Sequence, residues 1–221
     1  ASATMSDFES RSAAEPADPD VEAPARKRPK PGERRVQILQ ALAAMLEQPG
    51  GERITTAALA ARLEVSEAAL YRHFASKAQM FEGLIEFIEQ SVFSLISQIT
   101  TTGAGDGRQQ VARIVAMLLQ FGEKNPGMAR VMVGDALVFE NERLQQRMNL
   151  FFDKIESVLR QSLRDGALGE GSSTPGLDAQ VQAVVLTAFV VGQLQRFTRS
   201  GFRRVPTDKL DACLSRMLFI A

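Results

Sequence analysis

Residues 54–77 combine hydroxyl, small, aromatic and basic side chains at spacings that suit contact with a polyanion. The segment reads ITTAALAARLEVSEAALYRHFASK, a pattern typical of two short helices joined by a tight turn. Thr55, Thr56 and Ser66 stand where these helices should begin, and all three are suitable capping residues. Hydroxyls and free backbone N–H groups at helix starts bind phosphate well. The chemistry expected here is recognition of a nucleic-acid backbone.

The second helix of this pair is expected to present one face to DNA. Apolar side chains should fill the core between the first three helices, with small Ala60 where the two helices approach: Leu59, Leu63, Val65, Leu70 and Phe74. Glu67, Ala68, Tyr71 and Arg72 should then point outwards. Ala68 permits close approach and can touch a thymine methyl, while Tyr71 and Arg72 can reach phosphates or base edges. Glu67 can accept a hydrogen bond from cytosine or repel a wrong approach.

Two further basic residues lie at the end of this helix and shortly after it. His73 can hydrogen-bond a phosphate, or it can be a packing residue, and the sequence leaves both readings open. Lys77 lies in the first turn of the next helix, where the helix dipole disfavours a cation, so a bound phosphate would relieve that cost. The candidate DNA-binding residues are therefore Thr55, Thr56, Ser66, Glu67, Ala68, Tyr71, Arg72, His73 and Lys77.

The zero net charge of the 221 residues conceals a strong pattern. Residues 1–25 hold one Arg and six acids, whereas residues 26–77 hold ten Lys and Arg and five acids, and residues 78–221 hold fifteen of each sign. Positive charge is thus concentrated on the segment that carries the helix pair, as a DNA-binding module requires. RKRPKPGERR (26–35) forms a basic arm, which could equally be a solvated linker.

Composition excludes several classes of protein. Cys213 is the only cysteine, so an intramolecular disulfide is impossible, and with His73 as the only histidine a His/Cys zinc site is not expected. No secretory signal is apparent at the N-terminus. The apolar window VQAVVLTAFVVGQL (181–194) is too short and too interrupted to span a bilayer, and we expect a buried helix there. A soluble cytoplasmic protein is the expectation.

The elements that must position these residues are all predicted helices. Residues 1–32, rich in Pro and acids, should be a disordered tail. The first helix starts at Glu33, carries an apolar stripe and ends at PGG (49–51); that stripe is Val36, Leu39, Leu42, Ala43 and Leu46. Ser66 begins a helix that ends near Phe74, and Ser76 with Gln79 makes a capping box for a helix reaching about Ile99.

Five more helices are expected after the GAGDG breaker at 103–107. They cover about 108–123, 128–137, 140–164, 177–200 and 207–220, with a flexible loop at 166–176. No segment alternates like a strand. The sequence therefore predicts an all-α protein with a tail at 1–32, a helix-turn-helix DNA-binding domain at 33–78, and a helical domain at 79–221 for dimerisation and partner binding.

The helix pair and the start of the next helix resemble the TetR family of DNA-binding regulators, through ITTAALAARLEVSEAALYRHFASKAQMF (54–81). The resemblance implies a homodimer whose interface is built from the last two helices. The window 181–194 is apolar on nearly all sides, so we expect it to bury against its own domain and a partner, with Gly192 permitting close approach. Glu64 stands where this turn commonly has glycine, which predicts a strained turn.

Four later segments resemble one TetR subfamily, the nucleoid occlusion factors. They are LIEFIE (84–89), FGEKNPGMAR (121–130), ALVFENERLQQRMN (136–149) and FRRVPTD (202–208), and the resemblance runs from about Arg34 to Asp211. It implies a nucleoid-associated protein that binds palindromic double-stranded DNA and then antagonises FtsZ, the tubulin-like division protein. No membrane partner is implied.

The same resemblance implies a groove between the fourth and fifth helices that receives the C-terminal tail of FtsZ. Phe87 and Asn125 match family positions in that groove, Lys124 stands where arginine is usual, and Leu95 stands where a basic residue is expected. Taken alone, Phe87 could equally be a core residue, Lys124 a solvated charge and Asn125 a turn cap.

Two alternatives remain to be weighed. Catalysis is not expected, because Glu140 and Glu142 lie on a polar helix start where acids are favoured anyway, and no nucleophile–base pair or phosphate loop accompanies them. No cofactor, metal or small-molecule ligand is expected. The stronger alternative is a TetR-type repressor that releases DNA when a small molecule enters an apolar cavity in the second domain.

Overall fold

The computed structural model describes residues 29–30, 32–51, 53–102, 106–166 and 172–219, and every regular element within them is a helix. The all-α prediction is therefore confirmed for the described part of the chain. The 3₁₀ helix η1 covers Asp135–Leu137, and the α-helices are α1 (Glu33–Leu46), α2 (Thr56–Arg62), α3 (Glu67–Tyr71), α4 (Lys77–Thr101), α5 (Gly107–Lys124), α6 (Pro126–Met132), α7 (Glu142–Gly166), α8 (Pro175–Arg199) and α9 (Leu210–Leu218).

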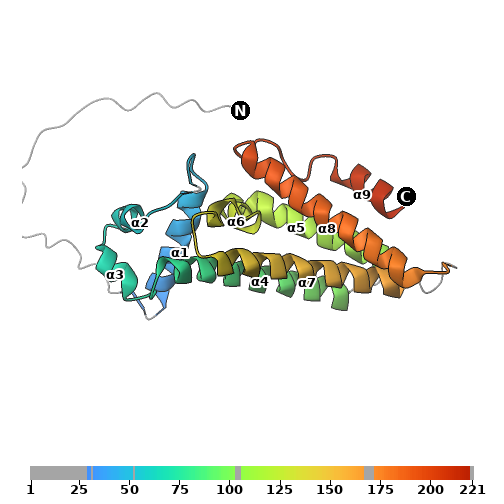
Figure 1. Cartoon of the computed structure of the whole chain (residues 1–221), viewed down its shortest axis with the longest axis horizontal. Helices are drawn as coiled ribbons and strands as arrows, with labels where there is room; N and C mark the ends of the chain where they lie inside the picture. Colours follow the sequence, from blue (N-terminus) through green and yellow to red (C-terminus); the bar gives the residue numbers. More distant parts are fainter. Residues whose placement is uncertain (1–28, 31, 52, 103–105, 167–171, 220–221) are drawn as a thin grey trace, which may run out of the picture.

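The helices α1, α2 and α3 gather at one end of an elongated molecule (Figure 1). Leu59, Leu70 and Phe74 are almost fully buried there, as the apolar pattern predicts, and Ala60 is buried where α2 and α3 meet. Leu63 and Val65 are only partly buried. Burying this much apolar surface between three short helices supplies the stability that none of them has alone.

Long helices form the rest of the molecule, with α4 and α7 running side by side along its length and α5 and α8 above them (Figure 1). Their facing stripes are closed to solvent: Ile88, Val92, Ile114, Leu118, Ile155, Leu159 and Val190 are all fully buried. Arg147 on α7 donates to both carboxylate oxygens of Glu89 on α4, at 2.9 and 3.0 Å. That hydrogen bonding raises the pKa of the Arg147 guanidinium above its ordinary value, although burial acts to lower it.

The predicted boundaries hold for the long helices and fail at three short ones. The helix expected over 128–137 is two elements, because Gly134 at φ +85° ends α6 before η1 begins. The last helix starts at Leu210 rather than 207, after Lys209 in a left-handed conformation. The helix expected to end near Phe74 stops at Tyr71, and residues 72–74 turn towards α4.

The predicted stripe of α1 divides between two environments. Leu42 and Leu46 are buried, and Ile38 joins them in the core. Val36 is 52% exposed, while Leu39 and Ala43 are only partly buried. The predicted stripe is therefore not uniformly buried, because α1 has a second apolar face that the described residues do not cover.

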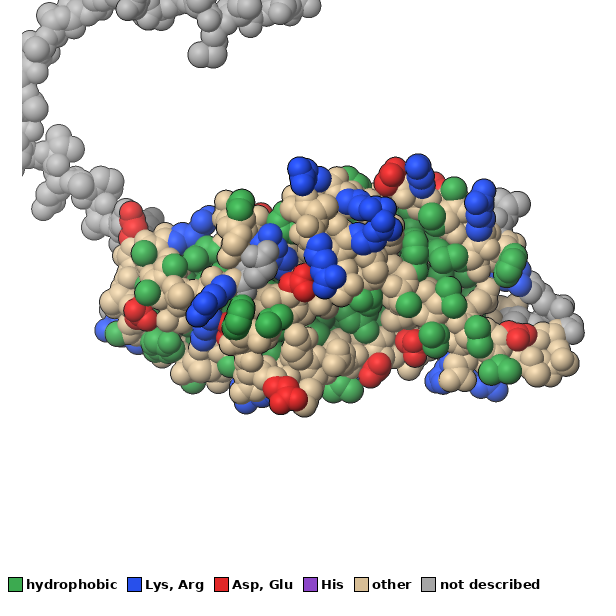
Figure 2. Space-filling view, turned by 45° about the horizontal axis from the view of Figure 1, so that its top comes forward, with side chains coloured by type: hydrophobic (Ala, Val, Ile, Leu, Met, Phe, Trp, Pro, Cys, Tyr) green, Lys and Arg blue, Asp and Glu red, His purple; other side chains and the backbone are tan. Residues whose placement is uncertain are grey.

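Helix α8 presents an apolar face to solvent, and hydrophobic side chains gather over this region in Figure 2. Leu177, Val181, Val184 and Val185 are each about half exposed or more, so the buried-helix expectation holds only for the opposite face. By length and composition alone, this 25-residue helix is apolar enough to cross a membrane, since its mean hydropathy over 18 residues is 1.4. The prediction considered only the shorter window 181–194 and judged it too short to span a bilayer. One such helix is weak evidence, because a buried or interface helix has the same composition.

Several predictions concern residues outside the described ranges. They include the tail at 1–28, the first part of the basic arm, the start of the GAGDG breaker and most of the loop at 166–176. These predictions remain sequence-based.

Candidate nucleic-acid interface and adjoining groove

The turn between α2 and α3 is built by two side-chain caps. The Thr55 hydroxyl accepts from the Ala58 N–H at 3.1 Å, and the Ser66 hydroxyl accepts from the Ala69 N–H at 3.2 Å. Thr55, and not Thr56, is thus the N-cap of α2. Glu64, in the turn between the helices, has φ +55°, a left-handed conformation that favours glycine. A residue with a side chain adopts it at a conformational cost of roughly 1–2 kcal/mol, so the predicted strain in this turn is confirmed.

The outward face of α3 has the composition expected of a reading surface. Glu67, Ala68, Tyr71 and Arg72 are all exposed, with 44% of Tyr71 accessible, and His73 is exposed just beyond the helix. Leu70 on the opposite side is fully buried. We call Thr55–Lys77 the reading head. Its exposed face agrees with the geometric part of the sequence prediction, and nucleic-acid contact itself stays a prediction.

Three of the predicted DNA-binding residues, Thr56, Glu67 and Lys77, make side-chain contacts within the protein. The Thr56 hydroxyl donates to a Glu67 carboxylate oxygen at 2.9 Å, which links the starts of α2 and α3. The Lys77 ammonium lies 2.6 Å from Glu140 and 6.0 Å from the centre of the Phe81 ring. Nothing in the sequence indicates this ion pair, because Glu140 is 63 residues away, in the part of the chain predicted to form the second domain. A phosphate bound at Lys77 would have to share the ammonium group with Glu140 or displace Glu140 from it.

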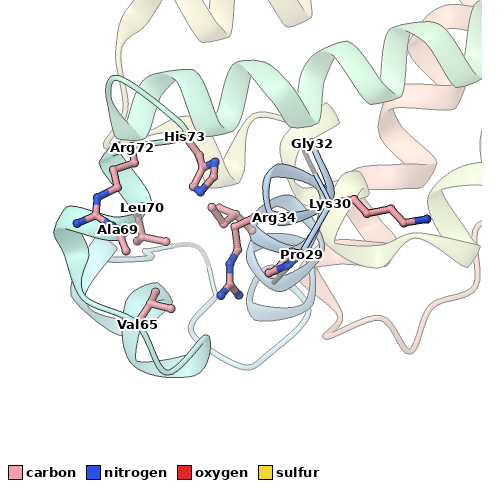
Figure 3. A pocket seen from close by; sticks show the side chains of 10 residues that line it. Pro29, Lys30, Gly32, Arg34, Val65, Ala69, Leu70, Arg72 and His73 are labelled. Atoms are coloured by element: carbon pink, nitrogen blue, oxygen red, sulfur yellow. The ribbon is translucent and has the colours of Figure 1, made fainter. Parts of the chain in front are cut away.

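The end of the basic arm lies against the reading head and encloses a basic pocket with it (Figure 3). Arg35 donates to the His73 carbonyl oxygen at 3.1 Å, and its guanidinium stacks 4.2 Å from the Phe74 ring centre. Arg34 lines the pocket beside Arg72 and His73, and donates to Gln37 at 3.2 Å. The described part of the arm, from Pro29, is thus in contact with the reading head.

A second, mainly apolar groove of about 370 Å³ lies between α1 and the helices α4 and α6. Phe87 and Asn125 both line it, opposite Val36, Leu39 and Ala43 of α1. Phe87 is 49% exposed, which excludes the reading of a core phenylalanine. We call this the α1–α4 groove. The uncovered face of α1 described above forms one of its walls.

The location of this groove differs from the one expected. The prediction placed it between the fourth and fifth helices, whereas the first helix and its C-terminal end supply much of the lining, and α4, Asn125 and α6 supply the rest. Asn125 also caps α5, since its amide donates to the Phe121 carbonyl at 2.9 Å. Lys124 is exposed next to the groove without lining it. Leu95 is 37% exposed two turns further along α4 and does not line it either.

Arg130 joins the reading module to the second domain, a role that the sequence did not suggest. This α6 residue is 4% exposed, and its guanidinium donates to the Leu46 and Gln48 carbonyl oxygens at 2.5 and 2.7 Å. It therefore caps the C-terminus of α1, where a cation is favoured. Gly127 permits the contact, because a β-carbon there would lie 2.3 Å from the Ala43 carbonyl oxygen.

The described residues offer little for metal chemistry. Within those ranges no three His, Cys, Asp or Glu side chains are placed to hold a metal ion. His73 and Cys213, the two residues of greatest interest for such a site, lie on the reading head and on α9.

Family models match both halves of the chain. Residues 38–84 match the model described as bacterial regulatory proteins of the tetR family, and residues 106–219 match that of a tetracyclin repressor-like C-terminal domain of the SlmA-like type. Among curated relatives, the nucleoid occlusion factor SlmA of Vibrio cholerae is 52% identical over 179 residues, 80% of this chain and 90% of its own length. That of Shewanella sediminis is 51% identical over 80% and 89%.

Solved structures with the same fold are more distant in sequence. The transcriptional regulator FadR from Bacillus subtilis, solved with stearoyl-CoA, is 15% identical with a TM-score of 0.66 over 84% of this chain and 98% of its own. A TetR transcriptional regulator from Legionella pneumophila is also 15% identical, with a TM-score of 0.65 over 86% and 98%. At this identity the likeness concerns the fold alone.

Proposed function

The chain belongs to the SlmA family of nucleoid occlusion factors, a branch of the TetR family, and on that premise we propose that it binds palindromic chromosomal DNA as a dimer and, when bound, antagonises FtsZ ring assembly over the nucleoid. The observation that carries the proposal is 52% identity over 90% of a curated nucleoid occlusion factor. This function places the protein in the cytoplasm on the nucleoid, and requires no catalysis.

The DNA-binding part of the proposal is assigned to the reading head. The exposed α3 face suits the major groove, with Ala68 allowing approach and Tyr71 and Arg72 reaching outwards. Thr55 and Ser66 lie at helix starts beside backbone N–H groups that suit phosphates. Thr56, Glu67, His73 and Lys77 complete the proposed contact set, with Glu67 and Lys77 exchanging a protein partner for DNA.

Dimerisation is assigned to α8 and α9. The exposed valines of α8 form an apolar face that water would otherwise cover, and a dimer interface removes this cost. A β-carbon at Gly192 would meet nothing within 4 Å in the protomer, which leaves room for a partner helix. Two-fold symmetry then pairs two reading heads with the two halves of a palindrome.

FtsZ binding is assigned to the α1–α4 groove. A short peptide tail needs an apolar slot with a few polar groups at its rim, and Phe87, Asn125 and the α1 face offer both. Exposed Lys124 at the rim suits an acidic tail residue. The groove and the α3 face involve different surfaces, so DNA and FtsZ can bind together.

Sedimentation of FtsZ filaments tests the proposal. With GTP present, the protein plus its palindromic duplex should reduce the filament fraction in the pellet, whereas the protein with a scrambled duplex should have little effect. No DNA-dependent change in pelleted FtsZ would contradict the proposal. Release of the duplex by a small molecule would instead support the ligand-responsive repressor.

A further inference from the structure

The basic pocket between the arm and the reading head has no acidic residue in its described lining. It measures about 430 Å³, and its charged or polar side chains are Lys30, Arg34, Arg72 and His73, around an apolar floor that includes Leu70. Figure 3 shows Arg34 and His73 reaching toward the space between the arm and α3, whereas Lys30 extends away from it. A pocket of this kind suits an anionic segment with some apolar character.

The nearby carboxylates are already engaged with the protein. Glu33 accepts from the Lys30 backbone N–H at 2.9 Å, and Glu67 accepts from the Thr56 hydroxyl. Neither lines the pocket. The Arg34 guanidinium, with His73 beside it, thus faces a space whose described lining holds no acid, and an anionic partner would be favoured there.

A partner of that chemistry is attached to the pocket itself. Residues 1–25 contain Asp7, Glu9, Glu15, Asp18, Asp20 and Glu22 against one arginine, a net charge of −5. Pro29, where the described chain begins, lines the pocket. Alanines, prolines and Phe8 in the same segment suit the apolar floor. We propose that the acidic segment 1–25 docks on this pocket and the adjoining α3 face, where it competes with DNA.

Tethering makes even a weak contact effective. Residue 13, the centre of the acidic segment, is 16 positions before Pro29, and a random coil of that length would span about 22 Å. Its effective concentration at the pocket is then on the order of millimolar, so a millimolar affinity already occupies the pocket about half of the time. Non-specific DNA, held mainly by charge, should be displaced most, and a specific palindrome least.

Docking of segment 1–25 can be measured without DNA. Only the competition with DNA rests on the proposed function, so the two can fail separately. A photo-crosslinking amino acid at Ala17 of the full chain should link to residues 65–73 and to the arm at about 0.05 M salt, and lose those links at about 0.5 M. The same probe at Ser172, beyond the far end of the helical domain, is the control. Links from position 17 that are absent, or spread evenly over the second domain, would overturn the proposal.

DNA affinity supplies the second measurement. A variant with the six tail acids changed to Asn or Gln should bind a non-specific duplex about 3- to 10-fold more tightly than the parent at about 0.05 M salt, with the difference vanishing near 0.5 M. A variant with the order of residues 1–25 shuffled keeps the charge of the segment, so its affinity for the non-specific duplex should equal that of the parent. Equal affinity of parent and neutral variant at low salt would overturn the competition. An affinity gain without cross-links would assign the effect to long-range repulsion and overturn docking.

Discussion

The reading head and the α1–α4 groove are neighbouring surfaces made in opposite ways. The reading head is one continuous segment of 23 residues, capped by its own hydroxyls, with a polar and basic exposed face. The groove is assembled from α1, α4 and α6, whose lining residues span Val36 to Met128, and its wall is apolar. These properties match the proposed partners, which are duplex DNA for the reading head and a short peptide for the groove.

Helix α1 is the element through which a structural change at one surface can reach the other. Helix α1 packs on α2 with one face and lines the groove with another. Arg130 holds the end of that helix from the second domain. A change in the position of α1 on DNA would therefore alter the groove, whereas a change on the exposed face of α3 alone would not.

The largest effect on stability should come from removing the Arg130 contact that holds α1 to the second domain. Arg130→Met removes a buried cation that holds two carbonyl oxygens, and should lower the free energy of unfolding by about 3 kcal/mol in urea titrations. Arg143→Met is the matched control, because that exposed guanidinium pairs with Glu82 at the surface and should cost less than about 1 kcal/mol. Equal losses for the two variants would show that Arg130 is not a special contact.

Phe87→Ala should damage the groove and spare the reading head. Removing a half-exposed aromatic anchor should weaken binding of an FtsZ tail peptide by about 2 kcal/mol, roughly 30-fold, in fluorescence anisotropy. DNA affinity should stay unchanged. Leu95→Ala is the control, since Leu95 is an exposed apolar residue of the same helix outside the groove. A peptide affinity that survives the loss of Phe87 would assign the tail to another surface.

Tyr71→Ala should weaken DNA binding and leave binding of the FtsZ tail peptide unchanged. If Tyr71 contacts a base, specific binding should weaken by an amount on the order of 1–3 kcal/mol, and non-specific binding by less. Tyr71→Phe removes only the hydroxyl and separates a hydrogen bond from ring contact. Equal losses on specific and scrambled duplexes would reassign Tyr71 to the phosphate backbone. Peptide affinity should be the same in all three proteins.

Lys77→Ala should have the smallest effect, visible mainly in the salt dependence of DNA binding. Losing one phosphate contact per half-site makes the slope of log affinity against log salt shallower by about one unit per half-site. Glu140→Gln frees the ammonium from its ion pair and should strengthen binding slightly at low salt. An unchanged slope for Lys77→Ala would show that the ammonium stays with Glu140 on DNA.

The two surfaces also differ in how far the sequence could predict them. Caps, turn and exposed residues of the reading head depend on neighbours within a few positions, so Thr55, Ser66 and Tyr71 were placed correctly. The groove depends on contacts between segments about 40 to 90 residues apart, for which periodicity carries no signal. Val36 and Leu39 were therefore predicted only as part of the apolar stripe of the first helix, and Phe87 was left between two readings.

Long-range polar contacts were missed for the same reason. Nothing around Arg130 or Glu140 indicates a distant carbonyl or ammonium, and both contacts join the two domains. The long helices, by contrast, were predicted to within about two residues at each end, because their apolar repeat and caps are local. The resemblance to known regulators supplied the candidate groove residues, and the structure then showed that α1 lines that groove as well.

Sedimentation velocity with a labelled palindromic duplex and a second label on an FtsZ tail peptide tests the central claim most directly. Because the α3 face and the α1–α4 groove are separate, both labels should sediment together with the protein dimer, and adding peptide should not release the duplex. Peptide that displaces the duplex, or that fails to join the duplex-bound dimer, would contradict the account of two surfaces occupied at once.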